Sequence, residues 1–376
     1  SETYQFSGHL HPGILVRGLG KQSLRFPCFY FGKEQGILPA FGGFTGVALV
    51  DPQPGDKVYA IVENSHRNVM SSPRLLKIAY DPIYAHPLPE GHRFPMLKYE
   101  LIPEQLLYEG TITQEHLFKP SVCADEIVLL THDADYLDKL KQQTLSAKEQ
   151  RHIGFPQSSE LTTRELMITQ GTIDCCHYAL KNGVSLNVAG GTHHAFADHG
   201  EGFCLLNDFA VAANFLLNEK LAEKICIIDL DVHQGNGTAK LFTNEQRVFT
   251  FSMHGEHNYP FHKEKSDWDI PLQEGIEDDA YLSLLEESLS KIITEQSPDF
   301  VFYLSGVDIL STDKFGKLKI SLEGCRRRDQ LVFSSLHSRG IPCAVAMGGG
   351  YSPDVKIIVE AHCNTFREAK TIYNLD

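Results

Sequence analysis

Long apolar segments are missing from this sequence. It has no run of about 18 or more consecutive apolar residues, the length that a membrane-spanning helix requires. It opens with SETYQFSGHLHPG, which has no basic region followed by an apolar stretch and so does not resemble a secretory signal. These absences predict a soluble, cytoplasmic protein without a membrane partner.

Cysteine pairs of the metal-binding or redox kind are missing as well. The nine cysteines are an odd number, and none of them forms a CxxC pair. Their neighbours are mostly apolar, strand-like runs such as CIIDL and PCAVAM. This pattern predicts reduced, buried thiols and argues against a disulfide scaffold or a zinc ribbon.

Positive charge is scarce. The formal net charge is −14, which argues against sequence-independent binding of nucleic acid because phosphate contacts need a basic surface. A cationic substrate is compatible with this balance. Residues 1–70 carry a net charge of +1 and the remaining residues −15, and this change indicates a possible domain boundary.

The overall composition is that of a globular protein. The chain has 376 residues, of which 42% are hydrophobic and 22% are charged. Short, glycine-punctuated extended pieces predict a small β-rich segment at residues 1–66. From about Leu75, apolar strands alternate with amphipathic helices, and we assign residues 67–376 to one α/β domain with a parallel sheet and helices on both faces. Strands are expected at 185–190, 224–230, 247–253, 299–306 and 341–349, and helices at 207–224 and 279–296.

Chemically active side chains follow four of these strands. The carboxyl ends of parallel strands meet at one edge of a sheet, where ligands bind. Taken singly, each has an ordinary structural explanation: an aspartate can cap a turn, DxH can lie on a surface strand, tandem histidines can start a helix, and GGG can be a flexible turn. Together, two aspartates and one histidine form an open divalent-metal site with room for water. The residues at this edge are Gly191, Thr192, His193, His194, Asp229, Asp231, His233, Asn236, Val307, Asp308 and Tyr351.

Several long motifs occur in a characteristic order. They are HPLPEGHRFPMLKY, THDADYL, GGTHHAFADHGEGFCLLNDFAVAANFL, IIDLDVHQGNGT, FSMHGEHNYPF, LSGVDILSTDKFGKL and AMGGGYS. From about Leu75 to Tyr373 the chain resembles the histone deacetylase family, whose fold is the arginase-deacetylase fold. The motifs are more similar to bacterial, class II or class IV members than to class I enzymes.

The resemblance implies two cation sites. Asp231, His233 and Asp308 match the positions that hold one zinc ion in the family. The family also commonly binds a monovalent cation, here expected to be potassium, beside the zinc and mostly through backbone oxygens. Its expected residues are Asp229, Asp231, His233, Ser252 and Met253.

The resemblance also implies roles for the catalytic residues. His193 and His194 match the tandem acid/base pair, with Asp229 behind the first and Asn236 behind the second. Class I members have Asp at the latter position, so the second histidine is expected to be less basic here. Tyr351 matches the hydrogen-bond donor to the substrate carbonyl, and Gly202, Phe203 and Tyr259 match the walls of the acyl-lysine tunnel.

The residue types suit amide hydrolysis without reference to a family. A zinc ion polarises the carbonyl and lowers the pKa of bound water toward about 7. One histidine takes the proton of the water, and a histidinium gives one to the leaving nitrogen. A tyrosine hydroxyl stabilises the tetrahedral oxyanion.

The N-terminal segment carries a second resemblance. Gly8, His9, Leu10 and His11, with LRFPCFYFG and LPAFGGFTG, resemble the C-terminal part of a calcineurin-like metallophosphoesterase associated with bacterial DNA ligases. The resemblance covers about residues 3–64. The upstream motifs that complete the two-metal site are absent from this chain, so we expect a β-rich remnant without catalysis of its own.

The leading hypothesis is a zinc amidohydrolase that acts on acylated lysine of a protein or peptide. Three alternatives remain: a deacetylase of acetylated polyamines or other small amines, a non-catalytic acyl-lysine binder or scaffold, and a phosphodiesterase that uses His9 and His11.

Overall fold

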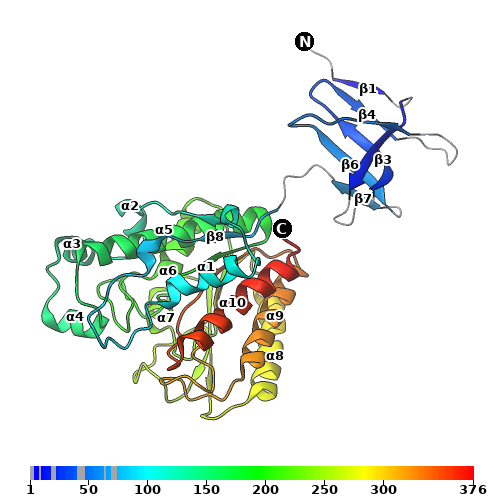
Figure 1. Ribbon diagram of the computed structural model, residues 1–376. Helices are drawn as coiled ribbons and strands as arrows, with labels where there is room; N and C mark the ends of the chain where they lie inside the picture. The colour runs from blue at the N-terminus through cyan, green and yellow to red at the C-terminus, as the bar shows by residue number, and fades with distance from the viewer. Residues whose placement is uncertain (1–3, 8–9, 18–22, 40–46, 63–64, 69–73) are drawn as a thin grey trace. The chain divides into compact units, whose positions relative to one another are not determined.

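The computed structural model describes residues 4–7, 10–17, 23–39, 47–62, 65–68 and 74–376 (Figure 1). The chain forms two compact units, residues 1–74 and 75–376. Gly8 and His9 of the predicted phosphoesterase-like motif lie outside the described residues, whereas Leu10 and His11 lie within them.

The first unit consists of short strands. They are β1 (Gln5–Ser7), β2 (Pro12–Arg17), β3 (Ser23–Phe31), β4 (Gln35–Ile37), β5 (Ala48–Leu49), β6 (Lys57–Val62) and β7 (Ser65–Asn68). The sheet runs β1-β4-β3-β2-β5, and β6 joins it by pairing with β3 and β7. Cys28 on β3 and Ala60 on β6 are partners in register, and both are buried. The prediction of a small β-rich N-terminal segment is confirmed.

The second unit is built on an eight-stranded parallel sheet with the order β13-β12-β11-β14-β15-β10-β8-β9. Strands β10, β11, β14 and β15 are buried at every residue, as expected for apolar parallel strands covered on both faces. The strands are β8 (Lys77–Ala79), β9 (Leu117–Phe118), β10 (Val184–Asn187), β11 (Ile225–Asp229), β12 (Val248–Gly255), β13 (Trp268–Leu272), β14 (Phe300–Leu304) and β15 (Cys343–Ala346).

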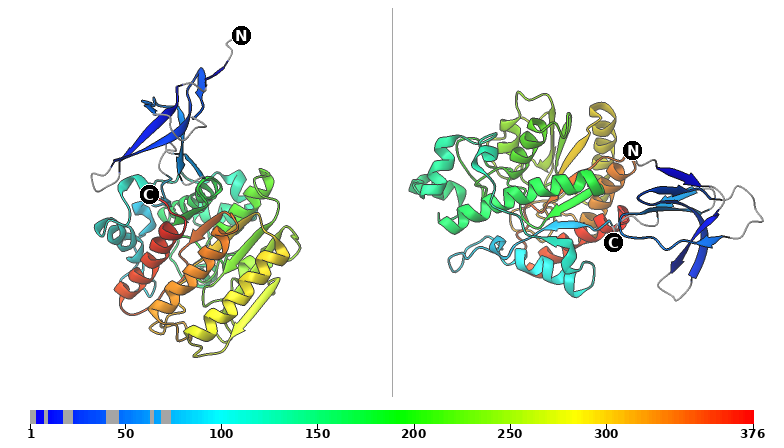
Figure 2. Two further views of the ribbon diagram at one scale, coloured as in Figure 1. Left: turned by 90° about the vertical axis from the view of Figure 1, so that its right-hand side faces the viewer. Right: turned by 90° about the horizontal axis from the view of Figure 1, so that it is seen from above.

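Helices cover the sheet on both faces, which confirms the predicted α/β class. One layer contains α8, α9 and α10 side by side, with α1 against α10, and α5 packs on β8, β10 and β15 with α6 beside it (Figure 2). The helices are α1 (Lys98–Tyr108), α2 (Asp125–Val128), α3 (Ala134–Gln142), α4 (Ala147–Ile153), α5 (Ser159–Asn182), α6 (Asp208–Asn218), α7 (Asn236–Leu241), α8 (Asp278–Gln296), α9 (Leu322–His337) and α10 (Val355–Ile372), and the 3₁₀ helices are η1 (Pro82–Tyr84) and η2 (Gln114–His116). Among the described helices, none is both long and apolar enough to cross a bilayer.

Local sequence explains where the helices end. Helix α5 begins after Ser158, whose side chain accepts a hydrogen bond from the N–H of Leu161, and ends before Gly183 in a positive-φ conformation. Helix α6 was predicted to continue to residue 224 but ends at Asn218. Lys220 has a φ of 56°, which turns the chain out of the helix and makes LAEK a connection to β11.

The order of the strands positions the candidate site. Strands β11, β14, β15 and β10 are consecutive neighbours at the centre of the sheet. Their carboxyl ends lead into the four segments that carry the histidines, aspartates and tyrosine singled out from the sequence. Residues far apart in the chain therefore meet at one edge of the sheet.

Candidate active site

Three buried residues form a cluster that can hold a metal ion. Asp231 and His233 follow β11, and Asp308 follows β14, and one ligand atom from each lies within 4.8 Å of the others. The His233 Nδ1 is 3.0 Å from Asp231 Oδ1 and 3.1 Å from Asp308 Oδ2. The structure thus brings together the three residues predicted as metal ligands.

Backbone groups hold these carboxylates in place. The N–H of Val232 donates to Asp308 Oδ1 at 2.9 Å, and the N–H of Gly349 donates to Asp231 Oδ2 at 2.7 Å. A Cβ atom added at Gly306 would collide with the carboxylate of Asp231, and one added at Gly349 would collide with that of Asp308. The two glycines therefore leave the room that the aspartates occupy around the cluster.

The electrostatics of the cluster suit a cation. Burial opposes a charge on His233, but hydrogen bonds and charge from Asp231 and Asp308 raise the pKa of His233 to about 10. Burial and repulsion by Asp231 raise the pKa of Asp308, to about 7. A site that stabilises positive charge this strongly, with two carboxylates and one imidazole, is a donor set that a divalent metal such as zinc accepts.

His193 forms a dyad with Asp229. The Nδ1 of His193 lies 2.7 Å from Asp229 Oδ2, and both side chains are buried. Burial disfavours the imidazolium, but the charge and hydrogen bond of Asp229 outweigh it and raise the pKa of His193 above its ordinary value. His193 is therefore the more basic member of the histidine pair.

His194 has a neutral partner instead. Its Nδ1 lies 2.7 Å from Asn236 Oδ1, and its ring centroid is 4.1 Å from that of His193. Burial lowers the pKa of His194 well below its ordinary value, and the nearby His193 and His233 add to the effect. The two adjacent histidines thus differ in charge preference because one faces a carboxylate and the other an amide.

Tyr351 reaches the site from the glycine-rich segment after β15. Its N–H donates to Asp313 Oδ2 at 2.6 Å, and its ring centroid lies 6.4 Å from that of His233. Burial raises the pKa of Tyr351 well above its ordinary value, and the charges of Asp231 and Asp308 raise it further. The hydroxyl is therefore neutral and able to donate a hydrogen bond.

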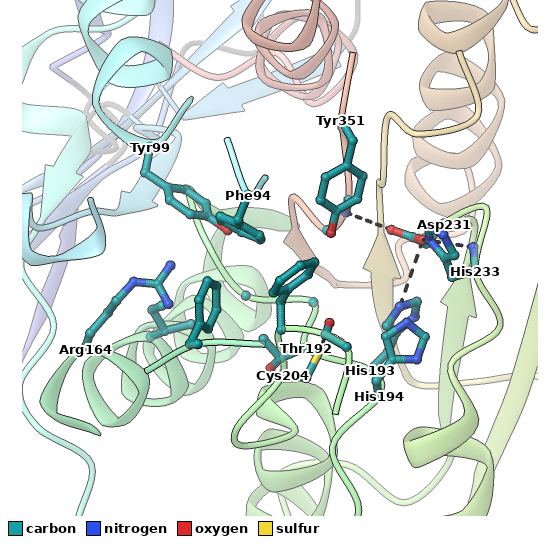
Figure 3. Close-up of a pocket in the computed structure, with 18 residues that line it drawn as sticks. Phe94, Tyr99, Arg164, Thr192, His193, His194, Cys204, Asp231, His233 and Tyr351 are labelled. Atoms are coloured by element: carbon teal, nitrogen blue, oxygen red, sulfur yellow. Dashed lines mark hydrogen bonds and ion pairs between the residues drawn. The ribbon is translucent and has the colours of Figure 1, made fainter. Parts of the chain in front are cut away.

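A pocket joins these groups, as Figure 3 shows, with Tyr351, His193 and His194 gathered beside Asp231 and His233. Its other residues are mostly aromatic or glycine. The full lining is Phe94, Tyr99, Phe155, Arg164, Ile168, Gly190, Gly191, Thr192, His193, His194, Gly202, Phe203, Cys204, Asp231, His233, Gly348, Gly349 and Tyr351.

Two of the three residues expected at the tunnel walls line the pocket, and the third does not. Gly202 and Phe203 line the pocket with positive φ values of 57° and 67°. A Cβ on Gly202 would collide with the ring of His194, so glycine permits this close approach. Tyr259 is not part of the lining, and its ring packs edge-on against His194 with centroids 5.0 Å apart.

The residues expected to hold a monovalent cation lie on neighbouring strands. Asp229 on β11 is the register partner of Ser252 on β12, and Met253 follows it, buried. The N–H of Asp231 donates to Asp229 Oδ1 at 3.1 Å. Asp229 belongs to the His193 dyad, and Asp231 and His233 belong to the cluster that could hold a metal, whereas Ser252 and Met253 lie on the neighbouring strand β12.

Several residues of the site had no role in the sequence analysis. Phe94 and Phe155 build the pocket wall with Phe203, with ring centroids between 5.1 and 5.2 Å apart. Arg164, from the N-terminal part of α5, also lines the pocket. Asp313 holds the Tyr351 segment. Phe94 lies inside the HRFPM motif, which could have indicated it, but nothing in the local sequence indicates Arg164.

Comparison with known proteins identifies the family. The model of the histone deacetylase domain matches residues 92–366. The chain belongs to the histone deacetylase family. The resemblance predicted from the motifs is confirmed for this unit, whereas the phosphoesterase resemblance of the N-terminal segment stays a prediction.

Relatives in this family come from bacteria and plants. A protein of Picosynechococcus sp. described as uncharacterized is 43% identical over 296 residues, covering 79% of this chain and 99% of that protein. Histone deacetylase 2 of Arabidopsis thaliana is 29% identical over 287 residues, covering 74% of each chain. The acetoin utilization protein AcuC of Staphylococcus aureus is 25% identical over 283 residues, covering 66% of this chain and 70% of that one.

Solved structures of histone deacetylase homologues share the fold of this chain. A histone deacetylase homologue complexed with SAHA superposes with a TM-score of 0.70 at 24% identity, covering 80% of this chain and 85% of that chain. A homologue from Aquifex aeolicus gives a TM-score of 0.68 at 24% identity, covering 80% and 88%. The predicted arginase-deacetylase fold is confirmed.

Proposed function

We propose that this protein is a zinc-dependent deacetylase that hydrolyses the amide bond of N-acetyl-lysine, or of a longer N-acyl-lysine, in a protein or peptide. The observation that carries the proposal is a pocket with aromatic walls that is lined by two histidines, a tyrosine, Asp231 and His233, with Asp308 completing the buried cluster that could hold a metal. Membership of the histone deacetylase family supports an acyl-amide hydrolase.

Asp231, His233 and Asp308 would hold the zinc. When bound, zinc supplies a polarised amide carbonyl and a water of lowered pKa. Three protein ligands leave one coordination position open, which is the arrangement of catalytic rather than structural zinc sites. A potassium ion at Asp229, Asp231, His233, Ser252 and Met253 would add positive charge beside the His193 dyad.

The two histidines divide the proton transfers. His194, whose pKa lies well below its ordinary value, is neutral at working pH and accepts the proton of the attacking water at Nε2. Asp229 raises the pKa of His193, so this imidazole carries positive charge more readily than His194 and stabilises the negative charge that develops. The proton taken up by the histidine pair then goes to the leaving lysine nitrogen.

Tyr351 and the aromatic walls act on the rest of the substrate. The neutral hydroxyl of Tyr351 donates to the oxyanion of the tetrahedral intermediate. Phe203 and Phe94 form an apolar wall that suits the methylene chain of lysine. An apolar wall beside polar groups suits a long, thin substrate group that ends in an amide.

The test compares three substrates with the zinc-loaded protein: an acetyl-lysine peptide, the same peptide with a longer acyl group, and an acetylated polyamine. We expect the lysine peptides to have the higher kcat/KM, and zinc removal by a chelator to abolish turnover. A higher kcat/KM for the acetylated polyamine would refute acyl-lysine as the substrate and favour a deacetylase of small amines. No hydrolysis of any of the three by fully zinc-loaded protein would refute the deacetylase proposal and favour a non-catalytic binder.

A further inference from the structure

Glu201 is fixed next to the active site without lining its pocket. It directly precedes Gly202, and its carbonyl accepts the N–H of Cys204 at 2.9 Å in a tight bridge. Its Oε1 accepts a hydrogen bond from Asn236 Nδ2 at 2.6 Å. Burial raises the pKa of the nearby Tyr259 hydroxyl, and the Glu201 carboxylate raises it further.

The contact with Glu201 decides which way the Asn236 amide points. An asparagine side chain has a donor end and an acceptor end of nearly the same shape, and its neighbours select the orientation. An ionised carboxylate can only accept hydrogen bonds, so Nδ2 must face Glu201. The acceptor Oδ1 is then left facing His194 Nδ1 at 2.7 Å.

This orientation in turn fixes the tautomer of His194. Because Asn236 Oδ1 can only accept, His194 Nδ1 must carry the hydrogen, and Nε2 keeps its lone pair. We propose that Glu201 is a positioning residue that orients the Asn236 amide and thereby holds His194 in the tautomer that can act as a base. The inference rests on the proposed function, since it assigns a purpose to that base.

The neighbouring dyad explains why a second residue is needed. Asp229 accepts the Nδ1 hydrogen of His193 through either oxygen, so it requires no partner to orient it. A reversed Asn236 amide would place the donor Nδ2 against His194 Nδ1. Nδ1 would then have to accept this hydrogen bond with its lone pair, and the hydrogen of the neutral imidazole would be on Nε2. His194 would then have no free site for the proton of water. Glu201 prevents this reversal. Its carboxylate contacts Asn236, which lies between it and the imidazole of His194.

Four variants separate orientation from other effects. Glu201→Met removes the acceptor and should lower kcat for the acetyl-lysine peptide on the order of tenfold, with KM and zinc content little changed. Glu201→Gln keeps an acceptor oxygen and should stay within about threefold of the parent. Asn236→Asp replaces the amide by a carboxylate with two acceptor oxygens, which the carboxylate of Glu201 repels. This variant alone should therefore have a lower kcat than the parent. The pair Glu201→Met with Asn236→Asp should recover most of the lost turnover, because Asp needs no orienting partner.

A merely structural role for Glu201 predicts a different pattern. In that case the Asn236→Asp change would not rescue Glu201→Met, and Glu201→Gln would fail along with it. Either result would overturn the proposal.

A second readout does not depend on turnover. The imidazole ¹⁵N shifts of His194, measured on the full chain labelled with ¹⁵N-histidine and assigned with a His194→Gln variant, report which ring nitrogen carries hydrogen. We expect hydrogen on Nδ1 in the parent and Glu201→Gln proteins, and a shift of population toward hydrogen on Nε2 in Glu201→Met. An unchanged tautomer in Glu201→Met refutes the positioning role, whereas an inactive parent with the expected tautomers refutes only the deacetylase proposal.

Discussion

Removal of the Tyr351 hydroxyl is the sharpest test of the active site. Tyr351→Phe keeps the ring, which packs against Phe94, Phe203 and Phe315 with centroid distances between 5.1 and 6.2 Å. The N–H of residue 351 still donates to Asp313, since it belongs to the backbone. The change should therefore leave the fold and the metal ligands as they are.

The expected loss follows from the state of the hydroxyl. Its pKa lies well above the ordinary value, so the parent enzyme has a neutral donor throughout the working pH range. One donor to a developing oxyanion contributes about 3 to 4 kcal/mol, which corresponds to a fall in kcat of roughly 10² to 10³. Ground-state binding depends mainly on the aromatic walls, so KM should change far less than kcat.

The assay is steady-state hydrolysis of an acetyl-lysine peptide, with zinc content measured on the same samples. Tyr373→Phe is the matched control, because it also removes a buried hydroxyl, here one that does not line the pocket and has no hydrogen-bond partner within the described part of the chain. It should keep parental turnover. If Tyr351→Phe also kept near-parental kcat at full zinc occupancy, Tyr351 would be a packing residue and the oxyanion role would be wrong.

Three further predictions concern the metal, acid stability and the N-terminal unit. Asp308→Ala should abolish both stoichiometric zinc and hydrolysis, because two protein ligands rarely hold a catalytic zinc, and full occupancy with normal turnover would exclude Asp308 as a ligand. Hydrogen bonds from Arg367 on α10 lower the pKa of Glu109 to about 2, so the pair stabilises the fold above about pH 4.5 and this is lost as the pH falls toward 2. Glu109→Gln should therefore cost about 1 kcal/mol at pH 7 and only a small fraction of that at pH 2 in urea unfolding, and a loss of equal size at both values would contradict the pairing. A fragment beginning at Ser71 should retain deacylation, whereas loss of turnover in a folded, zinc-loaded fragment would give the N-terminal unit a catalytic role.

The sequence alone determined the class of fold and the chemistry available to it. Strands β10, β11, β14 and β15 can be recognised in the sequence because parallel strands covered on both faces must be apolar along their length. The meeting of Asp231, His233 and Asp308 was predictable because these residues follow two such strands, whose carboxyl ends share an edge. Short-range patterns of this kind depend on the residues themselves and on the periodicity of one segment.

Tertiary structure decided what depends on contacts between distant segments. Helix α6 looked longer in the sequence because LAEK continues the helical pattern, and only the turn at Lys220 ends it. The aromatic wall joins Phe94 to Phe155 and Phe203, and Arg164 lines the same pocket from α5. That these four side chains meet cannot be read from their spacing along the chain. The hydrogen bond from Asn236 to Glu201 likewise joins residues 35 positions apart. Sequence supplies the donors and acceptors, but which of them meet, and hence which tautomer or charge each keeps, is set by packing between elements.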